Sequence, residues 1–331
     1  MELNWRNKFS QLIRSITSSK ASNNLSNIEP PKIVEPTTKT DLSNQYDHYK
    51  DQFWNNLQLV QEYICDNATG NKQTIWQIDI LSRFKQHLPF KEVLIVGCGN
   101  GWVERQLFDL GIGLHFDAFD ISEKYLEDGR REKGDRPINY YKDDINNLES
   151  LENAKYDAIF NVGALHHTFR LSRAIWKLSR SLKSNGLMFN FDYVGPSRNQ
   201  YSEAHLKILE TINSQLPKRF QSKHRLRPAK GSFEHGDPSE AIHSDLVRPT
   251  IERFFNIIYQ RDLNGGVAYQ ILWNNIDEFK KYDEEAKQTL EFLLTKDEEY
   301  TKLDKVPVLF WYGVGIPKPE HDIKSLETSH K

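Results

Sequence analysis

The sequence predicts an α/β fold built on a doubly wound sheet of about seven mostly parallel strands, with helical additions at its N-terminal and C-terminal sides. From Glu92 to Val194, short apolar runs typical of strands alternate with amphipathic helical stretches. This alternation implies right-handed crossovers and a parallel sheet. A glycine-rich turn follows the first run, and open α/β sheets bind ligands beyond the carboxyl ends of their strands.

Each element follows from its local pattern. The first strand is the run EVLIVG at residues 92–97, and the helix after it begins at about Trp102. A face of Leu, Ile and Ala at helical spacing predicts the helix over 170–182. The other predicted strands cover residues 114–120, 138–141, 156–162 and 186–194, with closing strands near 254–260 and 308–313. The other predicted helices cover about 46–66, 73–88, 122–133, 202–215, 267–281 and 284–300.

Composition excludes several classes of protein. The 44 basic and 46 acidic residues give a net charge of −2, without the basic excess of a chain-wide nucleic-acid binder, so no nucleic-acid partner is expected. The chain has no apolar run long enough to span a bilayer and no signal-peptide pattern. Two cysteines cannot form a disulfide framework or a four-thiolate zinc site. We therefore expect a soluble, cytoplasmic, globular protein.

The glycine turn is the sharpest local signal. Residues 96–101 read VGCGNG, where glycines allow a tight turn and a close approach to a ligand. A nicotinamide-dinucleotide site would prefer G-x-G-x-x-G, but Trp102 stands where the last glycine would be. The turn by itself is compatible with a nucleotide-type ligand or with a plain tight turn.

Acidic residues end the next two strands. Asp120 lies 21 residues after Gly99, where a carboxylate can accept both hydroxyls of a ribose. A helix N-cap is the alternative role for Asp120, but Ser122 already suits that position. Asp144 follows the third strand and can accept a hydrogen bond from an adenine amine while Ile145 packs on the ring. A solvated turn would use the same residues.

Together these motifs resemble those of class I S-adenosylmethionine-dependent methyltransferases, which have a Rossmann-like sheet. The resemblance covers about residues 45–316 and rests on VLIVGCGNG (93–101), DAFDIS (117–122), DDINNL (143–148), YDAIFNVGALHHT (156–168) and LKSNGLMFNFDYVGPSR (182–198). A further likeness of DPSEAIHSDL (237–246) and Gly265-Gly266 is to a bacterial branch associated with glycan or secondary-metabolite pathways. The resemblance implies S-adenosylmethionine as cofactor. It assigns cofactor contacts to Gly97, Cys98, Gly99, Asn100, Gly101, Asp120, Ile121, Asp144, Ile145, Asn161 and Val162.

The resemblance also suggests how the chain is divided. Residues 1–44 are predicted to be an amphipathic helix plus a flexible linker rich in Ser, Asn, Thr and Pro. The helix allows weak peripheral membrane contact through residues 1–20, and docking on the chain or on a partner is the alternative. Residues 45–194 form a helical lead-in and the cofactor-binding core. Residues 195–316 form a substrate cap and closing strands, and 317–331 a disordered tail.

Catalytic candidates follow from their position beside the strand ends. Histidine titrates near neutrality, so His166 or His167 suits a general base, or a hydrogen bond that holds the loop. Asp192 and His243 are further catalytic candidates. For the substrate we expect Tyr193, Arg198 and Glu240; Arg198 would grip a phosphate or carboxylate or form a surface ion pair. The segment of Glu240 also fits a helix start.

The predicted reaction is transfer of a methyl group to a hydroxyl, or less readily an amine, of a small-molecule or glycan-type acceptor. A non-catalytic S-adenosylmethionine-binding partner subunit is the alternative, and a nicotinamide oxidoreductase is disfavoured by Trp102. No metal site is expected, because adjacent Asp143 and Asp144 point apart and neither an HxxxH motif nor a carboxylate triad is present. The sequence does not determine the acceptor, the oligomeric state or which residue is the base.

Overall fold

The computed structural model describes residues 54–222, 226–227, 237, 239–273 and 275–319. The predicted amphipathic helix and linker at 1–44, the start of the predicted 46–66 helix and most of the predicted tail lie outside these residues. Within the described part of the chain, no helix combines the length and the apolar composition that a membrane crossing requires.

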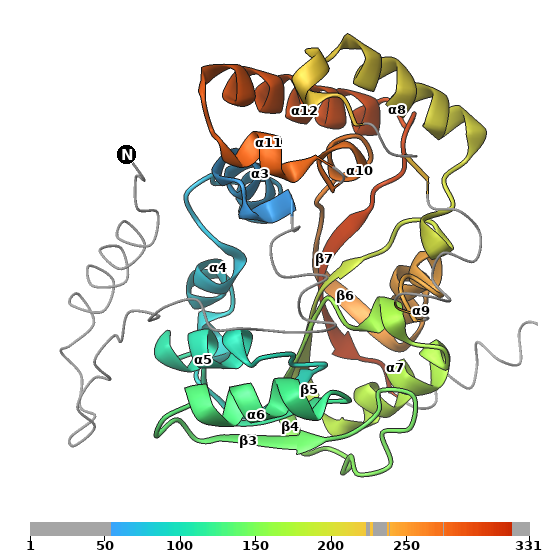
Figure 1. Ribbon diagram of the computed structural model, residues 1–331. Helices are drawn as coiled ribbons and strands as arrows, with labels where there is room; N and C mark the ends of the chain where they lie inside the picture. Colours follow the sequence, from blue (N-terminus) through green and yellow to red (C-terminus); the bar gives the residue numbers. More distant parts are fainter. Residues whose placement is uncertain (1–53, 223–225, 228–236, 238, 274, 320–331) are drawn as a thin grey trace, which may run out of the picture. The chain divides into compact units, whose positions relative to one another are not determined.

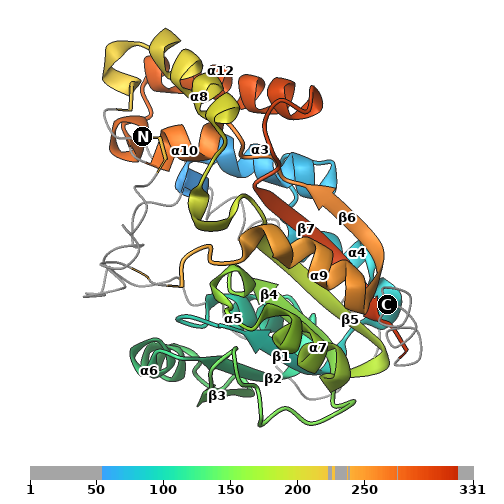
Figure 2. The same ribbon diagram turned by 90° about the vertical axis from the view of Figure 1, so that its right-hand side faces the viewer.

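A seven-stranded sheet forms the centre of the molecule (Figures 1 and 2). Its strand order is β3-β2-β1-β4-β5-β7-β6, in which β1 to β5 are parallel and β7 runs antiparallel to both neighbours. The predicted fold class is therefore confirmed. The strands are β1 (Phe90–Val96), β2 (Gly113–Asp120), β3 (Ile138–Lys142), β4 (Tyr156–Val162), β5 (Leu182–Tyr193), β6 (Phe255–Asp262) and β7 (Phe310–Pro317).

Alternate side chains of the strands enter two separate cores, one on each face of the sheet. Val93 and Ile95 of β1 point to one face, and Leu94 and Val96 point to the other. The first face is covered by α4 (Trp76–Arg83), α5 (Trp102–Asp109) and α6 (Glu123–Glu132), with the 3-10 turn Lys85–His87 after α4. The second is covered by α7 (Leu171–Ser181) and α9 (Val247–Phe254).

Helix α9 (Val247–Phe254) is not among the helices that the sequence predicts. Val247, Ile251 and Phe254 recur at helical spacing and are buried against the sheet. Pro249 lies in the first turn of α9, where the missing N–H breaks no helical hydrogen bond. Because this helix is short and contains a proline, the spacing of its apolar residues does not predict it.

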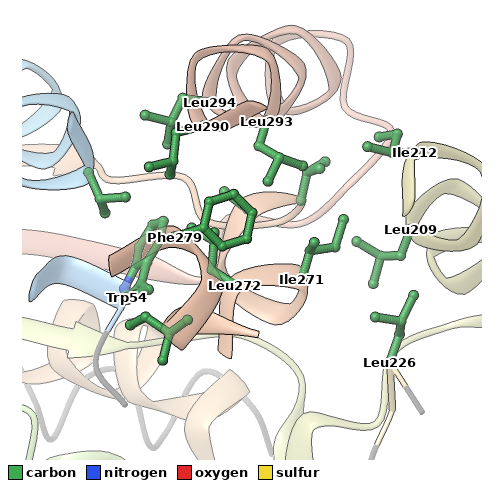
Figure 3. Close-up of a cluster of buried hydrophobic side chains, with 14 of the residues drawn as sticks. Trp54, Leu209, Ile212, Leu226, Ile271, Leu272, Phe279, Leu290, Leu293 and Leu294 are labelled. Atoms are coloured by element: carbon green, nitrogen blue, oxygen red, sulfur yellow. The ribbon is translucent and has the colours of Figure 1, made fainter. Parts of the chain in front are cut away.

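A second group of helices forms a cap with its own apolar core, at the top of Figure 1. Figure 3 shows this core, where Leu209 of α8, Ile271 of α10 and Leu290 of α12 converge. The single helix predicted over 267–281 is two helices, α10 and α11. The cap helices are α3 (Gln58–Thr69), α8 (Glu203–Gln215), α10 (Ala268–Trp273), α11 (Ile276–Lys280) and α12 (Glu284–Lys302).

The helical lead-in also packs in the cap core. Trp54, Leu57 and Val60 belong to the cap core rather than to the cores against the sheet. The lead-in that we assigned to the 45–194 part therefore packs with helices that follow residue 195.

Candidate cofactor and catalytic site

The glycine loop leaves β1 directly beside the end of β4. A Cβ added at Gly97 would lie 2.5 Å from the Cβ of Ala164, so only glycine allows this approach. Gly99 has φ +53°, and an added Cβ there would meet no heavy atom within 4 Å. The Cys98 backbone N–H donates to Phe119 O at 2.9 Å, and burial raises the pKa of the Cys98 thiol. The loop is therefore fixed by the sheet beneath it but presents open backbone at Gly99.

The next residues lead into α5. The Asn100 carbonyl accepts from Arg105 Nη1 at 2.7 Å, and Gly101 precedes the helix with φ +80°. The buried Asn100 Oδ1 has no hydrogen-bond partner among the described residues, so it has acceptor capacity left for a donor group. Trp102 begins α5 half-exposed, where a pyrophosphate would need a small residue.

Asp120 ties the glycine loop to the end of β2. Its Oδ2 accepts from Gly99 N at 2.9 Å and its Oδ1 from Ser122 N at 2.8 Å. Burial raises the pKa of this carboxyl, although the backbone amides oppose the shift. Ser122 caps α6 by accepting from Tyr125 N, so Asp120 is not the cap. Ile121 beside it is 64% exposed, so its side chain is accessible to a ligand at this edge.

The end of β3 forms a turn held by its own acids. Asp144 Oδ1 accepts from the Asn146 backbone and side-chain nitrogens, both at 2.9 Å. Asp143 Oδ1 accepts from Asp144 N, and Asp143 Oδ2 from Ser150 Oγ. Ile145 is half-buried in the same turn. These acids therefore stabilise a turn, which is the alternative role considered for them. The contact of Asp144 with an adenine, at the same edge as Asp120, stays a prediction.

Asn161 has a structural role that its predicted cofactor contact did not include. Its Nδ2 donates to Asn190 Oδ1 and Asp192 Oδ2, both at 2.7 Å, and joins β4 to β5. Its Oδ1 accepts from Ala164 N and Leu165 N at 3.2 and 3.1 Å and shapes the loop after β4. Val162, half-buried, follows at the end of the strand. Any cofactor contact of Asn161 would come from its backbone.

Asp192 lies beneath His166 and does not face the open edge. Its side chain is fully buried, and His166 Nδ1 lies 2.6 Å from Asp192 Oδ1. Leu165 N and Tyr193 N also donate to this carboxylate, at 3.0 and 2.8 Å. Because burial prevents contact between Asp192 and an acceptor, the geometry contradicts our prediction that Asp192 acts as a base. Asp192 instead orients His166.

His167 contacts the segment that follows residue 236. Its Nδ1 lies 3.0 Å from Ser239 Oγ and 3.4 Å from Asp237 Oδ2. Ile242 N donates to His166 O at 3.1 Å, which joins this segment to the loop after β4. The roles of Asp237 and Ser239 were missed, because nothing local in the sequence pairs them with His167, which lies 72 residues before Ser239.

The pKa values of the two histidines shift in opposite directions. Burial lowers the pKa of His166, but the Asp192 and Glu240 carboxylates outweigh it and raise the pKa overall. Burial and the neighbouring charge of His166 lower the pKa of His167. These opposite shifts favour the proton on His166 over His167.

Glu240 completes a cluster with these rings. Glu240 Oε2 lies 3.7 Å from Nε2 of His166 and 3.7 Å from Nε2 of His167. These three side chains place atoms of metal-ligating type within 4.8 Å of one another. The expectation of no metal site rested on local spacings in the sequence, whereas these three residues come together only in the folded chain.

The remaining predicted residues take other positions. Tyr193 is buried and packs edge-on against Phe310 and His166. Arg198 Nη1 donates to Glu240 O at 2.9 Å and so supports the backbone of Glu240. His243 precedes the 3-10 turn Ser244–Leu246 and is not part of the cluster.

A search against known families gives one match in the sheet domain. Residues 94–190 match the model of the methyltransferase domain. This stretch of the chain is therefore similar to a methyltransferase domain. The match begins in β1 and ends in β5, and so includes the glycine loop, Asp120 and both histidines.

The chain is similar to curated enzymes over part of their length. It is 25% identical over 139 residues to malonyl-[acyl-carrier protein] O-methyltransferase of Bacillus anthracis, covering 41% of this chain and 51% of that protein. It is 27% identical over 110 residues to ubiquinone biosynthesis O-methyltransferase of Rickettsia akari, covering 33% and 42%. The chain thus spans about half the length of these relatives. A solved S-adenosylmethionine-dependent methyltransferase from Mesorhizobium loti is 15% identical, with a TM-score of 0.42 over 71% of this chain and 96% of that one.

The residues at the ends of β1 and β2 fit S-adenosylmethionine. The open backbone at Gly99 and the unpaired Asn100 Oδ1 suit the amino-acid part of the cofactor, whose ammonium can donate to that oxygen. Asp120 has acceptor capacity for a ribose beyond its two amide contacts, and the exposed Ile121 suits an adenine. The domain match and this geometry indicate S-adenosylmethionine as the cofactor.

Proposed function

We propose that this protein is an S-adenosylmethionine-dependent methyltransferase that methylates a hydroxyl of a small-molecule or glycan-type acceptor. The single observation that supports this most is the position of the His166–His167 pair. The pair follows Ala164, and Ala164 packs on Gly97 of the predicted cofactor loop. A polar cluster with acid–base chemistry therefore lies next to the site that fits the cofactor.

When bound, S-adenosylmethionine would supply a sulfonium methyl: the acceptor oxygen forms a bond to that carbon, the C–S bond breaks with its electron pair on sulfur, and the hydroxyl proton is released. The chain's contribution is to bind, orient and exclude water, and proximity alone can supply ~7–11 kcal/mol of a barrier. Uncharged His167 can take the released proton, whereas protonated His166, held by Asp192, cannot.

An oxygen acceptor is favoured over an amine. A hydroxyl has a high pKa and needs a proton acceptor as it attacks, while a neutral amine needs none. The described cluster supplies that acceptor. The two curated relatives are also named as O-methyltransferases. We further propose that residues 195–316 form the acceptor side of the site, because Glu240 from this part meets the histidines.

The test has two stages. Isothermal titration of the full-length protein with S-adenosylmethionine and S-adenosylhomocysteine should show one site for each. A screen of hydroxylated small molecules with isotope-labelled cofactor should then give a product with the mass of one added methyl group. Binding without any product would support a non-catalytic cofactor-binding subunit, and absence of binding would exclude both readings.

A variant pair separates chemistry from binding. His167→Ala should lower kcat and leave the cofactor Kd unchanged, because His167 lies on the acceptor side. His115→Ala is the matched control: His115 is exposed and sits 3.6 Å from Glu92 at the start of β2, far from the strand ends that form the site. Equal kcat values for the two variants would contradict the role of His167.

A further inference from the structure

We propose that His166, His167 and Glu240 form a binding site for a divalent transition-metal ion of the Zn²⁺ class. The ligand atoms would be Nε2 of each histidine and Oε2 of Glu240. This site deepens the proposed function, since the ion would hold the acceptor hydroxyl, but ion binding itself requires neither cofactor nor acceptor.

The distances match such a site. Both histidine Nε2 atoms lie 3.7 Å from Glu240 Oε2, and the three atoms lie within 4.8 Å of one another. In a tetrahedral site with metal–ligand bonds of about 2.0–2.2 Å, ligand atoms are about 3.3–3.6 Å apart. Small side-chain rotations therefore suffice to close the three atoms on one ion.

The outer nitrogen of each histidine has the partner that metal-bound histidines normally have. A ligating imidazole usually donates its second N–H to a carboxylate, carbonyl or hydroxyl, which orients the ring. His166 Nδ1 is 2.6 Å from Asp192 Oδ1. His167 Nδ1 is 3.0 Å from Ser239 Oγ and 3.4 Å from Asp237 Oδ2. Both Nε2 atoms are thereby directed towards Glu240.

The backbone that carries the ligands is held in place. The histidines lie on the 3-10 turn Leu165–His167 at the end of β4. The Glu240 segment is joined to this turn by the bond from Ile242 N to His166 O, and to the loop after β5 by the bond from Arg198 Nη1 to Glu240 O. Ligands from two distant segments are therefore brought together before any ion binds, which reduces the entropy cost of binding.

Charge and ligand type select the ion. The carboxylates of Asp192, Asp237 and Glu240 surround two imidazoles, so the cluster carries excess negative charge that a dication would offset. Two nitrogen ligands favour Zn²⁺, Co²⁺ or Ni²⁺ over Mg²⁺ and Ca²⁺, which prefer oxygen. Three protein ligands leave a fourth position for an exogenous oxygen, as in catalytic zinc sites.

That fourth position gives the ion its role in the proposed reaction. A hydroxyl oxygen bound there would have a lowered pKa and would lose its proton to solvent before it attacks the methyl carbon. With the ion bound, His167 Nε2 would be a ligand and would no longer be the proton acceptor proposed for the metal-free site, and the ion would displace the Nε2 proton of His166. Acceptors whose hydroxyl can reach a metal ion, such as vicinal diols or hydroxy acids, are the class this site would take.

The first measurement is direct binding. Full-length protein is freed of metal with a chelator, dialysed, and titrated with ZnCl₂ by calorimetry, and with CoCl₂ while its visible absorption is recorded. We expect one ion per chain and the intense visible bands of four-coordinate Co²⁺. Failure to bind either ion would overturn the proposal.

Variants locate the site. Glu240→Gln and His167→Ala should each weaken Zn²⁺ binding by more than 100-fold, and Asp192→Asn by about 10–100-fold through loss of ring orientation. Glu92→Gln and His115→Ala, from an exposed His–Glu pair elsewhere on the sheet, should change it less than about 2-fold. Circular dichroism and thermal melting establish that each variant is folded. Unchanged affinity in both folded ligand variants would place any ion elsewhere and refute the site.

The two proposals can fail separately. Methyl transfer that survives chelation, in protein that binds no ion, would refute the metal site and leave the methyltransferase function intact. Stoichiometric ion binding, lost in Glu240→Gln, without methyl transfer to any acceptor would support the site and count against the proposed function.

Discussion

Replacing Asp192 with asparagine tests whether one buried carboxylate organises the catalytic edge of the sheet. Asp192 Oδ1 accepts from His166 Nδ1 at 2.6 Å and from Tyr193 N at 2.8 Å. Its Oδ2 accepts from Asn161 Nδ2 at 2.7 Å and from Leu165 N at 3.0 Å. All four neighbours donate, so the amide of an asparagine must turn its NH₂ group towards two other donors.

The magnitude follows from the less costly orientation. If the NH₂ faces Asn161 and Leu165, these keep their bonds to Asn190 Oδ1 at 2.7 Å and to Asn161 Oδ1 at 3.1 Å. The chain still loses two bonds to a charged acceptor and weakens the bond to His166. Each charge-assisted hydrogen bond contributes ~1.5–3 kcal/mol, and the retained partners offset part of the loss. The free energy of unfolding should therefore fall by ~2–4 kcal/mol. The melting temperature should fall by about 3–6 °C.

Urea denaturation and thermal melting at neutral pH measure this loss. Asp157→Asn is the matched control, because Asp157 also accepts two backbone N–H groups, from Lys91 and Glu92, and pairs with Lys183. Its side chain is 25% exposed, so water can replace the lost contacts and the cost should stay at about 1 kcal/mol or less. If the two variants lose the same stability, the buried network does not hold this edge together.

Three more predictions concern the cofactor loop and its surroundings. Gly99→Ala should weaken S-adenosylhomocysteine binding at least ~10-fold, as measured by calorimetry. Gly111→Ala is the control: Gly111 also has a positive φ and open space around it, so this change should cost similar stability and leave the affinity unchanged. Equal affinities of the two variants would refute the contact at Gly99. Asp120→Asn should weaken the same ligand by about 10–100-fold as a ribose hydroxyl loses a charged acceptor, and Asp117→Asn on the same strand should not, so a shared effect would point to damage to β2. Burial raises the pKa of Glu104 from 4.5 to about 7, so the folded chain holds a proton that the unfolded chain releases. The free energy of unfolding should therefore fall by ~3 kcal/mol as pH rises from about 4.5 to 7. Urea midpoints measured across this pH range should show the fall in the native sequence and not in Glu104→Gln.

Much of the sheet domain could be predicted because its signals are local. The strands of a parallel sheet are buried on both faces, so each appears as a short apolar run between turns, and all seven predicted strands overlap the observed ones. The cap was harder to predict. Helix α9 is short and contains Pro249, and Trp54 and Leu57 are apolar in either core, so their sequence cannot say which one they join.

The sequence by itself determined the glycine loop and the acid after β2, because a tight turn and a strand end are set by neighbouring residues and their backbone preferences. The tertiary structure alone decided the cluster of His166, His167 and Glu240. Ser239, beside Glu240, lies 72 residues beyond His167, and only the packing of its segment against the ends of β4 and β5 brings them together. The same packing buried Asp192 and turned a predicted base into the group that orients a histidine, since burial depends on what the rest of the chain places over a residue.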